Sequence, residues 1–365
     1  MVSYKRLGDY IREVNVRNRD LKVTKPMGIN IDKHFMPSVA NVIGTDLSNY
    51  KLVSRRQFAC NLMHVGRDEK IPMAIMESDN PIIVSPAYFV FEVSNPNILL
   101  PEYLMMWFSR KEFDRNAWFY TDADVRGGMD KDALLDMRLP IPSIERQREI
   151  VAEYETLSKR IRLNKQMISS LEATAQTLYR KMFVDGIDKE NLPEGWRMGK
   201  IGDLAEVNSG KTCNDKSDKK DDQYKYPVAG ASGIIGFSSI YNFDEKLMTT
   251  GRVGTLGVVN RYHAKMYMAD NVLIIRSNYY EYCYQLLISL DYNDITKGGV
   301  QSLITQTDLK ECSVIIPAKD DLELFESEST SLYSFVEIKK QENEKLTELQ
   351  SLLLAKLGQL KLNEV

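Results

Sequence analysis

The chain has 365 residues, of which 43% are hydrophobic and 27% charged, and a formal net charge of −3 at pH 7. This length allows about two or three domains, and the composition is that of an ordinary globular protein. No stretch approaches the roughly 18 consecutive apolar residues that a membrane helix needs. The opening residues, MVSYKRLGDY, lack the apolar core of a signal peptide, so we expect a cytoplasmic location.

Cysteine and histidine are too sparse and too scattered to predict a metal site. The cysteines Cys60, Cys213, Cys283 and Cys312 form no Cys-x-x-Cys pair, and there are only three histidines. We expect reduced and mostly buried thiols. The near-neutral charge neither predicts nor excludes a nucleic-acid ligand, because charge can be patchy within a neutral total.

The first part of the chain predicts a domain that mixes strands and helices. Residues 81–94, PIIVSPAYFVFEVS, carry the β-branched and aromatic residues of strands. Residues 101–113, PEYLMMWFSRKEF, predict a helix. We expect Trp107 in the hydrophobic core.

A long helix is predicted next. From Ile150 to Met182 the positions of one stripe alternate steps of four and three residues, which is a heptad pattern. The segment contains neither glycine nor proline, so the helix would run about 40 residues, or ~60 Å. Residues 184–196, VDGIDKENLPEGW, predict a linker into the second half.

The second half repeats the first. Four short matches occur in the same order: 7–9 with 201–203, LMHVGR (62–67) with LMTTGR (247–252), RGGM (126–129) with KGGV (297–300), and LPIP (139–142) with VIIP (314–317). Residues 271–277 and 279–290 are the expected counterparts of the strand and helix segments of the first half. Shifting the heptad stripe by 175 residues predicts a second long helix from Phe325 to Leu357.

Neither long helix can leave its apolar stripe in water, so we expect the two to pack as an antiparallel coiled coil. The alternative is that each helix packs on its own domain. The predicted seam residues are Ile150, Leu157, Ile161, Leu171, Leu178, Leu332, Val336, Leu346 and Leu353. Asn164, Lys339 and Asn343 also lie in the seam, where polar residues help to fix the register.

The predicted fold class is therefore α+β, with two repeated domains separated by two long helices. We expect the domains at residues 1–142 and 186–317, and the helical regions at 143–185 and 318–365.

Residues 209–212, Ser-Gly-Lys-Thr, resemble the end of a phosphate-binding loop. That motif requires a glycine five residues before Gly210, and the residue there is Ala205. The preceding IGDLAEV is also not a buried apolar strand. The spacing therefore argues against ATP binding here.

Three segments carry a family resemblance. They are LPIPSIERQREIVAEYETLSKRI (139–161), LPEGWRMGKIGDLAEVNSGKT (192–212) and TKGGVQSLITQTDLKE (296–311). Over essentially its whole length the chain resembles the specificity subunit of type I restriction–modification systems. Pro142, Gln147, Ile150 and Val151 carry the sharpest match, and the second helix lacks the equivalent Gln and Ile-Val pair.

The resemblance implies a non-catalytic subunit that binds double-stranded DNA. Residues 1–142 and 186–317 would be target recognition domains, each reading half of a split asymmetric target. The helical regions would set the spacing and dock two methyltransferase subunits, and restriction subunits would join the complex. No cofactor is expected in this chain, since S-adenosylmethionine, ATP and Mg belong to the partner subunits. Consistently, there is no Asn-Pro-Pro-Tyr methylase motif, and DNPII (79–83) breaks that pattern.

Candidate DNA-binding residues are basic or hydroxyl side chains expected on loops. The candidates are Arg55, Arg56, Arg67, Arg126, Lys211, Thr212, Lys219, Lys220, Arg252 and Lys297. Arg67 and Arg252 follow a glycine at matching places, while Arg126 and Lys297 precede paired glycines. Ordinary turns and surface charge are the alternative for all ten. Trp118, Phe119 and Tyr120 are expected mainly in the core, although they could instead wedge at a base step.

Three other functions stay open at this point. The chain could be a coiled-coil scaffold that binds only proteins, or the specificity subunit of an orphan methylation system. A nuclease or methylase half would require a carboxylate cluster or cofactor loop in both repeats, and none is present in register.

Overall fold

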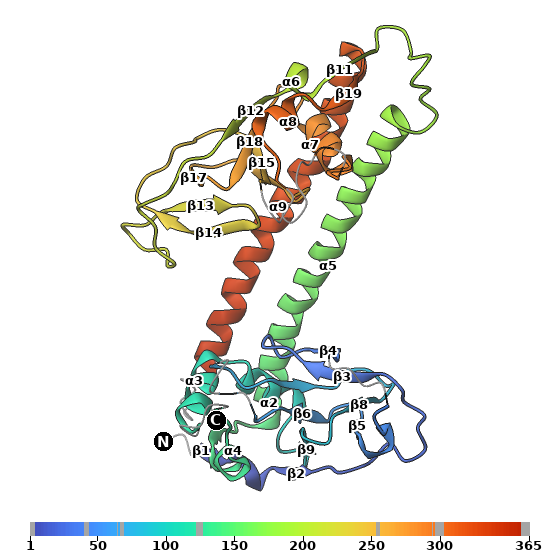
Figure 1. The fold of residues 1–365 in the computed structure, drawn as a ribbon. Coiled ribbons are helices and arrows are strands. Elements are labelled where there is room, and N and C mark those ends of the chain that lie inside the picture. The colour runs from blue at the N-terminus through green and yellow to red at the C-terminus, as the bar shows by residue number, and fades with distance from the viewer. Residues whose placement is uncertain are drawn as a thin grey trace. The chain divides into compact units, whose positions relative to one another are not determined.

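The computed structural model describes residues 4–39, 44–63, 65, 69–121, 127–252, 256–293, 295 and 303–358. Its contacts divide the chain into a first unit, Met1–Asn164 with Gln341–Val365, and a second unit, Lys165–Lys340. Each unit holds one globular domain and a stretch of both long helices, so the boundary crosses those helices (Figure 1).

Short strands and helices build the domain of the first unit. Among the described residues its sheets have the orders β1-β10, β2-β9-β6-β7 and β4-β3-β8-β5. The strands are β1 (Tyr4–Arg6), β2 (Ile11–Glu13), β3 (Pro26–Ile29), β4 (Phe35–Pro37), β5 (Lys51–Val53), β6 (Phe58–Cys60), β7 (Met73–Ile75), β8 (Ile82–Val84), β9 (Phe89–Val93) and β10 (Arg138–Pro140). The helical segments are η1 (Leu7–Asp9), η2 (Leu47–Asn49), α2 (Pro101–Phe108), α3 (Lys111–Phe119) and α4 (Lys131–Asp136). Strands β8 and β9 confirm the prediction for residues 81–94.

Aromatic side chains hold the core of this domain together. Phe58 on β6 stacks on Phe91 on β9, with ring centroids 4.9 Å apart, and Phe108 on α2 meets Phe58 edge-on at 5.8 Å. Trp107 is buried, as predicted. Such ring pairs stabilise the fold beyond the contribution of buried apolar area, and here they hold α2 on the central sheet.

The predicted helix at 101–113 is two helices, because the chain turns at Arg110. This residue has an extended backbone, and its side chain is buried with its guanidinium 4.1 Å from the Trp107 ring. Its Nε donates to the carbonyl of Leu354 on the second long helix at 3.1 Å. A cation at a helix C-terminus satisfies carbonyls that lack partners, so this contact ties the turn between α2 and α3 to the end of the second long helix.

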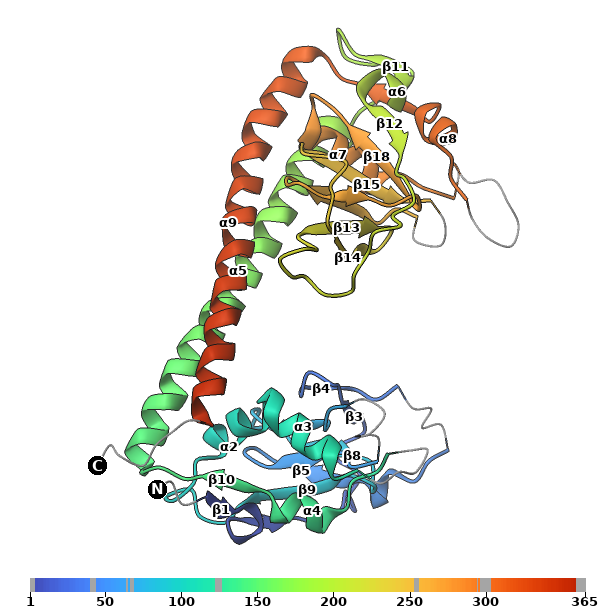
Figure 2. The ribbon, with the colours of Figure 1, turned by 90° about the vertical axis from the view of Figure 1, so that its left-hand side faces the viewer.

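The domain of the second unit has the same kinds of element. Its described sheets have the orders β11-β19, β12-β18-β15-β16 and β14-β13-β17. Figure 2 shows β12, β18 and β15 side by side, with β13 and β14 beyond them. The strands are β11 (Arg197–Lys200), β12 (Glu206–Ser209), β13 (Tyr226–Gly230), β14 (Gly233–Ser238), β15 (Leu247–Gly251), β16 (Val259–Tyr262), β17 (Tyr267–Met268), β18 (Val272–Arg276) and β19 (Ser313–Ile316). The helices are α6 (Ile201–Leu204), α7 (Tyr280–Ser289) and α8 (Gln306–Lys310).

Equivalent hydrogen bonds show that the two domains are copies of one fold. The N–H of Leu7 donates to the carbonyl of Met137 at 2.8 Å, and that of Ile201 donates to Cys312 at 3.1 Å. The Tyr103 hydroxyl donates to Pro140 at 3.1 Å, as the Tyr282 hydroxyl does to Ile315 at 3.0 Å. In each domain, the helix after the central sheet is thus tied to the strand that closes the domain.

Two of the four sequence matches between the halves have the wrong register. The carbonyl of Leu62 accepts from Met129, and that of Arg252 accepts from Ile304. Leu62 therefore corresponds to Arg252 and not to Leu247, because Leu62 follows strand β6 whereas Leu247 begins β15. Met129 likewise corresponds to Ile304 and not to Val300.

The two long helices pack antiparallel in each unit, as predicted. They are α5 (Ile144–Phe183) and α9 (Lys319–Leu357). In the first unit, the Asn164 amide donates to Asn343 Oδ1 at 3.0 Å and Gln350 donates to Ser158 at 2.7 Å. In the second unit, the rings of Tyr179 and Phe325 are 6.0 Å apart. None of the described helices has the length and apolar character that crossing a membrane requires.

The Asn164–Asn343 pair allows a test of the helix packing. Asn164→Leu alone leaves the Asn343 amide without its partner, so we expect the free energy of unfolding to fall by about 1–3 kcal/mol. Replacing both residues with leucine removes the polar groups together and should restore stability. Chemical denaturation measures both, with the exposed Glu344→Gln as control. Equal stability of the single and double variants would contradict the pairing.

Candidate nucleic-acid interface

The Gly-Lys-Thr turn at 210–212 is packed against the chain before β18. The Gly210 N–H donates to the carbonyl of Val272 at 3.2 Å, and the Lys211 N–H donates to Met268 at 3.0 Å. A Cβ atom on residue 210 would lie 1.8 Å from the Ala269 carbonyl oxygen, so only glycine fits. A phosphate-binding loop needs free N–H groups, and here both are occupied by carbonyls.

Side chains from three separate segments meet at this turn. The Thr212 hydroxyl donates to the Asp270 carboxylate at 2.7 Å, and the Arg252 guanidinium donates to the Asp270 carbonyl at 3.4 Å. Lys211, Thr212 and Asp270 are exposed and Arg252 is half-buried. We call these four residues the Asp270 cluster. It offers cationic donors and one carboxylate acceptor, the groups that read guanine and cytosine edges.

Asp270 was not among the sequence candidates. It is an acidic residue in a turn before a buried strand, and such residues are usually solvated. Only the fold brings it beside Thr212 and Arg252, which lie 58 and 18 residues away along the chain.

Lys219 and Lys220 lie in a different loop, before the β14-β13-β17 sheet. Both are exposed, and Asp215 and Asp221 organise the loop around them. Asp215 accepts from the N–H and hydroxyl of Ser239, and the hydroxyl hydrogen bond holds the pKa of that carboxyl below its usual value. Residues 215–225 carry four lysines and four aspartates, so the loop has no net charge and is a weaker phosphate-binding candidate than the Asp270 cluster.

Arg55 and Arg56 form the turn between β5 and β6 in the first unit. Arg55 pairs with Asp79 at 2.8 Å and Arg56 with Glu102 at 3.0 Å. This turn precedes β6, whereas Leu62, the counterpart of Arg252, follows β6. The arginines and Leu62 therefore lie at opposite ends of this strand. The structure therefore does not place these arginines where the second unit has its Asp270 cluster. Arg67, Arg126 and Lys297 lie outside the described residues, and the register above shows that Arg67 is not the counterpart of Arg252.

Trp118, Phe119 and Tyr120 are exposed, so the expectation of a core position is wrong. Their exposed fractions are 47%, 80% and 54%. Thr121, the next residue, bridges to Met129, whose N–H donates to Leu62. The aromatic residues therefore lie beside the end of β6 that corresponds to the Asp270 cluster, and they are candidates for base stacking.

Three of the predicted seam residues, Leu171, Leu332 and Val336, pack together in one cluster between α5 and α9. Val336 is buried against Ala175 and Tyr333, with Leu171 and Leu332 packed around them. Ile150 is buried in the core of the first domain, at the place that Phe325 takes in the second. The others are half-buried, namely Leu157, Ile161, Leu178, Leu346 and Leu353.

Comparison with known proteins agrees with this architecture. Residues 193–348 match the family model of the type I restriction modification DNA specificity domain. The HindI specificity subunit of Haemophilus influenzae is 23% identical, over 75% of this chain and 80% of the relative. The MjaIX specificity subunit of Methanocaldococcus jannaschii is 21% identical, over 73% of this chain and 71% of the relative.

A solved structure has the same fold. The S subunit of a type I restriction-modification system from M. genitalium superposes with a TM-score of 0.60 at 12% identity, covering 97% of this chain and 95% of that one.

The family model thus places a DNA specificity domain at residues 193–348, in a chain of two duplicated domains and two long helices. Over most of its length the chain is similar to specificity subunits of type I restriction–modification systems, the family that its sequence resembles. Such subunits are the non-catalytic part of their enzymes.

Arg252 allows a test of the interface. We expect Arg252→Ala to weaken binding to a duplex that carries the target by about 1–3 kcal/mol, or roughly 5–150-fold, because a charged donor to a base edge or phosphate is lost. Arg276→Ala is the control, since Arg276 lies at the other end of β18 and pairs with Glu206 and Glu245. Titration of labelled duplex measures both. Equal weakening by the two variants would contradict the assignment.

Proposed function

We propose that this subunit reads a split, asymmetric DNA target, with one half-site for each globular domain. This proposal rests on the duplication of the fold. Equivalent positions at the ends of the strands β6 and β15 carry different side chains. Arg252 in the second unit corresponds to Leu62 in the first. A common frame with different contact residues suits two readers of different sequences.

The paired helices would hold the two readers at a set spacing and dock two methyltransferase subunits, with restriction subunits joining where they are present. Both helices keep continuous α-helical structure over 40 and 39 residues. Half-sites one turn of B-DNA apart lie ~34 Å from centre to centre, and a helix of ~60 Å less the widths of the domains spans this distance. S-adenosylmethionine, ATP and Mg would be bound by the partner subunits in the cytoplasm.

The helix length allows a test of the spacing. Four residues inserted into α5 between Asn164 and Lys165 lengthen the helix by about one turn, or ~6 Å. We expect the preferred spacer of the target to change while both half-site sequences stay the same. Mapping of methylated adenines measures both properties. An unchanged spacer in a folded, active complex would refute the ruler role.

Exchange of one domain tests the division of labour. Strand β10 ends at Pro140 and α5 begins at Ile144, so a junction after Pro142 leaves both elements intact. Replacing residues 1–142 with another recognition domain should alter one half-site only. The donor must accept Gln147, whose side chain bonds to Ile98 and Leu100. A change in both half-sites would rule out independent readers.

The chief rival, a scaffold that binds only proteins, differs in its behaviour toward DNA. A reader of DNA shows binding that weakens steeply with salt, because counterions are released from the phosphates. Gel-shift titration at several salt concentrations, with and without the methyltransferase subunit, distinguishes the two.

A further inference from the structure

The first unit contains a groove between its globular domain and helix α5. Its volume is about 420 Å³, which lies within the ~300–1,000 Å³ range of ligand sites. Apolar lining comes from Ile75, Met76, Met105, Met106 and Tyr154, with Ser158 on the helix side. Methionine side chains adapt to the shape of a partner, so this lining suits a protein contact.

The duplicated fold shows which residues occupy the same place in the second unit. Strand pairing sets Phe58 opposite Ile75, and Met248 opposite Arg261. Phe58 and Met248 are equivalent because they pair with Phe91 and Ile275 on the corresponding central strands. Ile75 therefore corresponds to Arg261.

The helices extend this correspondence. Ile150 and Phe325 are the equivalent core residues of α5 and α9, so Ser158, eight residues on, corresponds to Tyr333. The equivalent tyrosines Tyr103 and Tyr282 follow Glu102 and Glu281, which are therefore also a pair.

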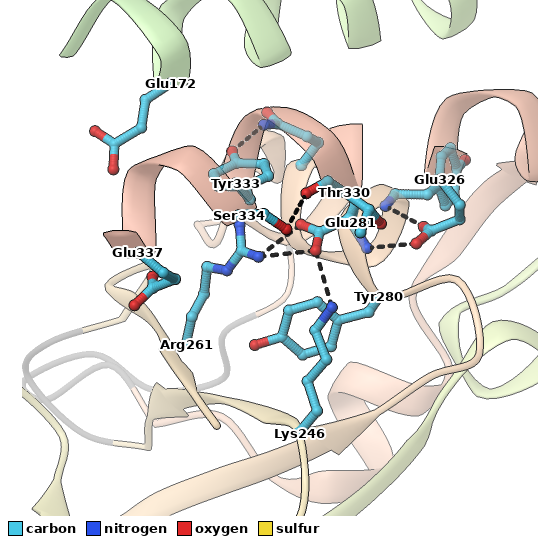
Figure 3. A network of polar contacts seen from close by, with 12 residues as sticks. Glu172, Lys246, Arg261, Tyr280, Glu281, Glu326, Thr330, Tyr333, Ser334 and Glu337 are labelled. Atoms are coloured by element: carbon cyan, nitrogen blue, oxygen red, sulfur yellow. Dashed lines mark hydrogen bonds and ion pairs between the residues drawn. The ribbon is translucent and has the colours of Figure 1, made fainter. Parts of the chain in front are cut away.

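In the second unit, side chains of the chain itself fill the place that corresponds to the groove. The Arg261 guanidinium lies 3.7 Å from the centroid of the Tyr333 ring and 2.7 Å from the Glu281 carboxylate (Figure 3). Lys246 adds a second cation at 3.0 Å from Glu281, and Gln285 donates to the Tyr333 hydroxyl at 2.7 Å. Tyr333 is 4% exposed, and this burial raises the pKa of its hydroxyl. A ring, a cation and a carboxylate thus close the site.

The first unit keeps two of these three parts. Glu102 supplies the carboxylate, and Arg56, at the place of Lys246, supplies a cation 3.0 Å from it, whereas Ile75 stands where the second unit has Arg261. No ring stands at the place of Tyr333, because Ser158 is there, and Met105 stands where the second unit has Tyr284. The Tyr154 ring lines the groove one helical turn earlier, at the place of Ser329. Ser158 instead bonds to the Tyr154 carbonyl at 3.0 Å and to Gln350 at 2.7 Å.

The charges around the groove favour an aromatic occupant over a cation. Arg55, Arg56, Lys159 and Arg162 outnumber Glu77, Glu102 and Glu155 at its walls. Arginine side chains stack on electron-rich aromatic rings, so they favour a ring in the groove. A cation in the groove would offer them no such contact.

We propose that this groove receives a tyrosine or tryptophan side chain of the methyltransferase subunit, in the place that Tyr333 fills in the second unit. The identity of the partner rests on the proposed function. Aromatic residues seated in such pockets contribute much of the energy of protein interfaces. Because the second unit fills its own site, the contact is specific to one of the two methyltransferase positions.

Ser158→Tyr tests the proposal by filling the groove from within. We expect a folded protein in which one of the two methyltransferase subunits binds at least about tenfold more weakly, so that native mass spectrometry at limiting concentration shows a 1:1 complex where the wild type forms 2:1. Ser158→Ala is the matched control, since it leaves the groove open and should keep the 2:1 complex. A folded Ser158→Tyr variant that retains wild-type affinity at both positions overturns the proposal.

A photo-crosslink gives a reading that does not depend on how Ser158→Tyr folds. Benzoylphenylalanine in place of the exposed Lys159, at the edge of the groove, should crosslink to the methyltransferase subunit in the complex with duplex DNA. Crosslinks to DNA alone, or none, overturn the proposal. If the wild-type chain binds no methyltransferase subunit at all, the proposed function fails. If it binds the subunit but gives no crosslink from residue 159, only the proposal about the groove fails.

Discussion

The packing of α5 against α9 is the constraint on which the rest of the structure depends. Each helix carries an apolar stripe that cannot remain in water, and each buries part of it on the other helix. The ends of the stripes are buried differently, because Ile150 and Phe325 enter the cores of the globular domains. The middle of each stripe thus packs against the other helix, and one end of each stripe packs in the core of a globular domain.

Each globular domain is closed so that its chain passes directly into a helix. The first strand of each domain pairs with the last, β1 with β10 and β11 with β19. Three residues separate β10 from α5, and two separate β19 from α9. The contact between domain and helix is kept even where the sequence departs from the family pattern. Gln147 accepts the N–H of Leu100 in the first unit, and Glu326 accepts those of Glu281 and Tyr282 in the second.

Periodicity and repetition predicted the helices and the duplication, because both depend on patterns that extend over many residues. The register of individual matches was harder to predict. LMHVGR and LMTTGR look alike, yet one follows a strand and the other forms one, and only the hydrogen bonds of Leu62 and Arg252 reveal this. Residue type was also misleading at Phe119, an apolar residue that is exposed. Asp270 and the open groove at Ser158 arise from tertiary contacts that no local pattern encodes.

The most direct measurement maps methylated adenines in a genome that expresses this chain with its methyltransferase subunit. The account predicts a split, asymmetric motif, in which two specific half-sites are separated by a nonspecific spacer of fixed length. A continuous motif, or two half-sites with variable spacing, would contradict the claim that paired helices hold two different readers apart.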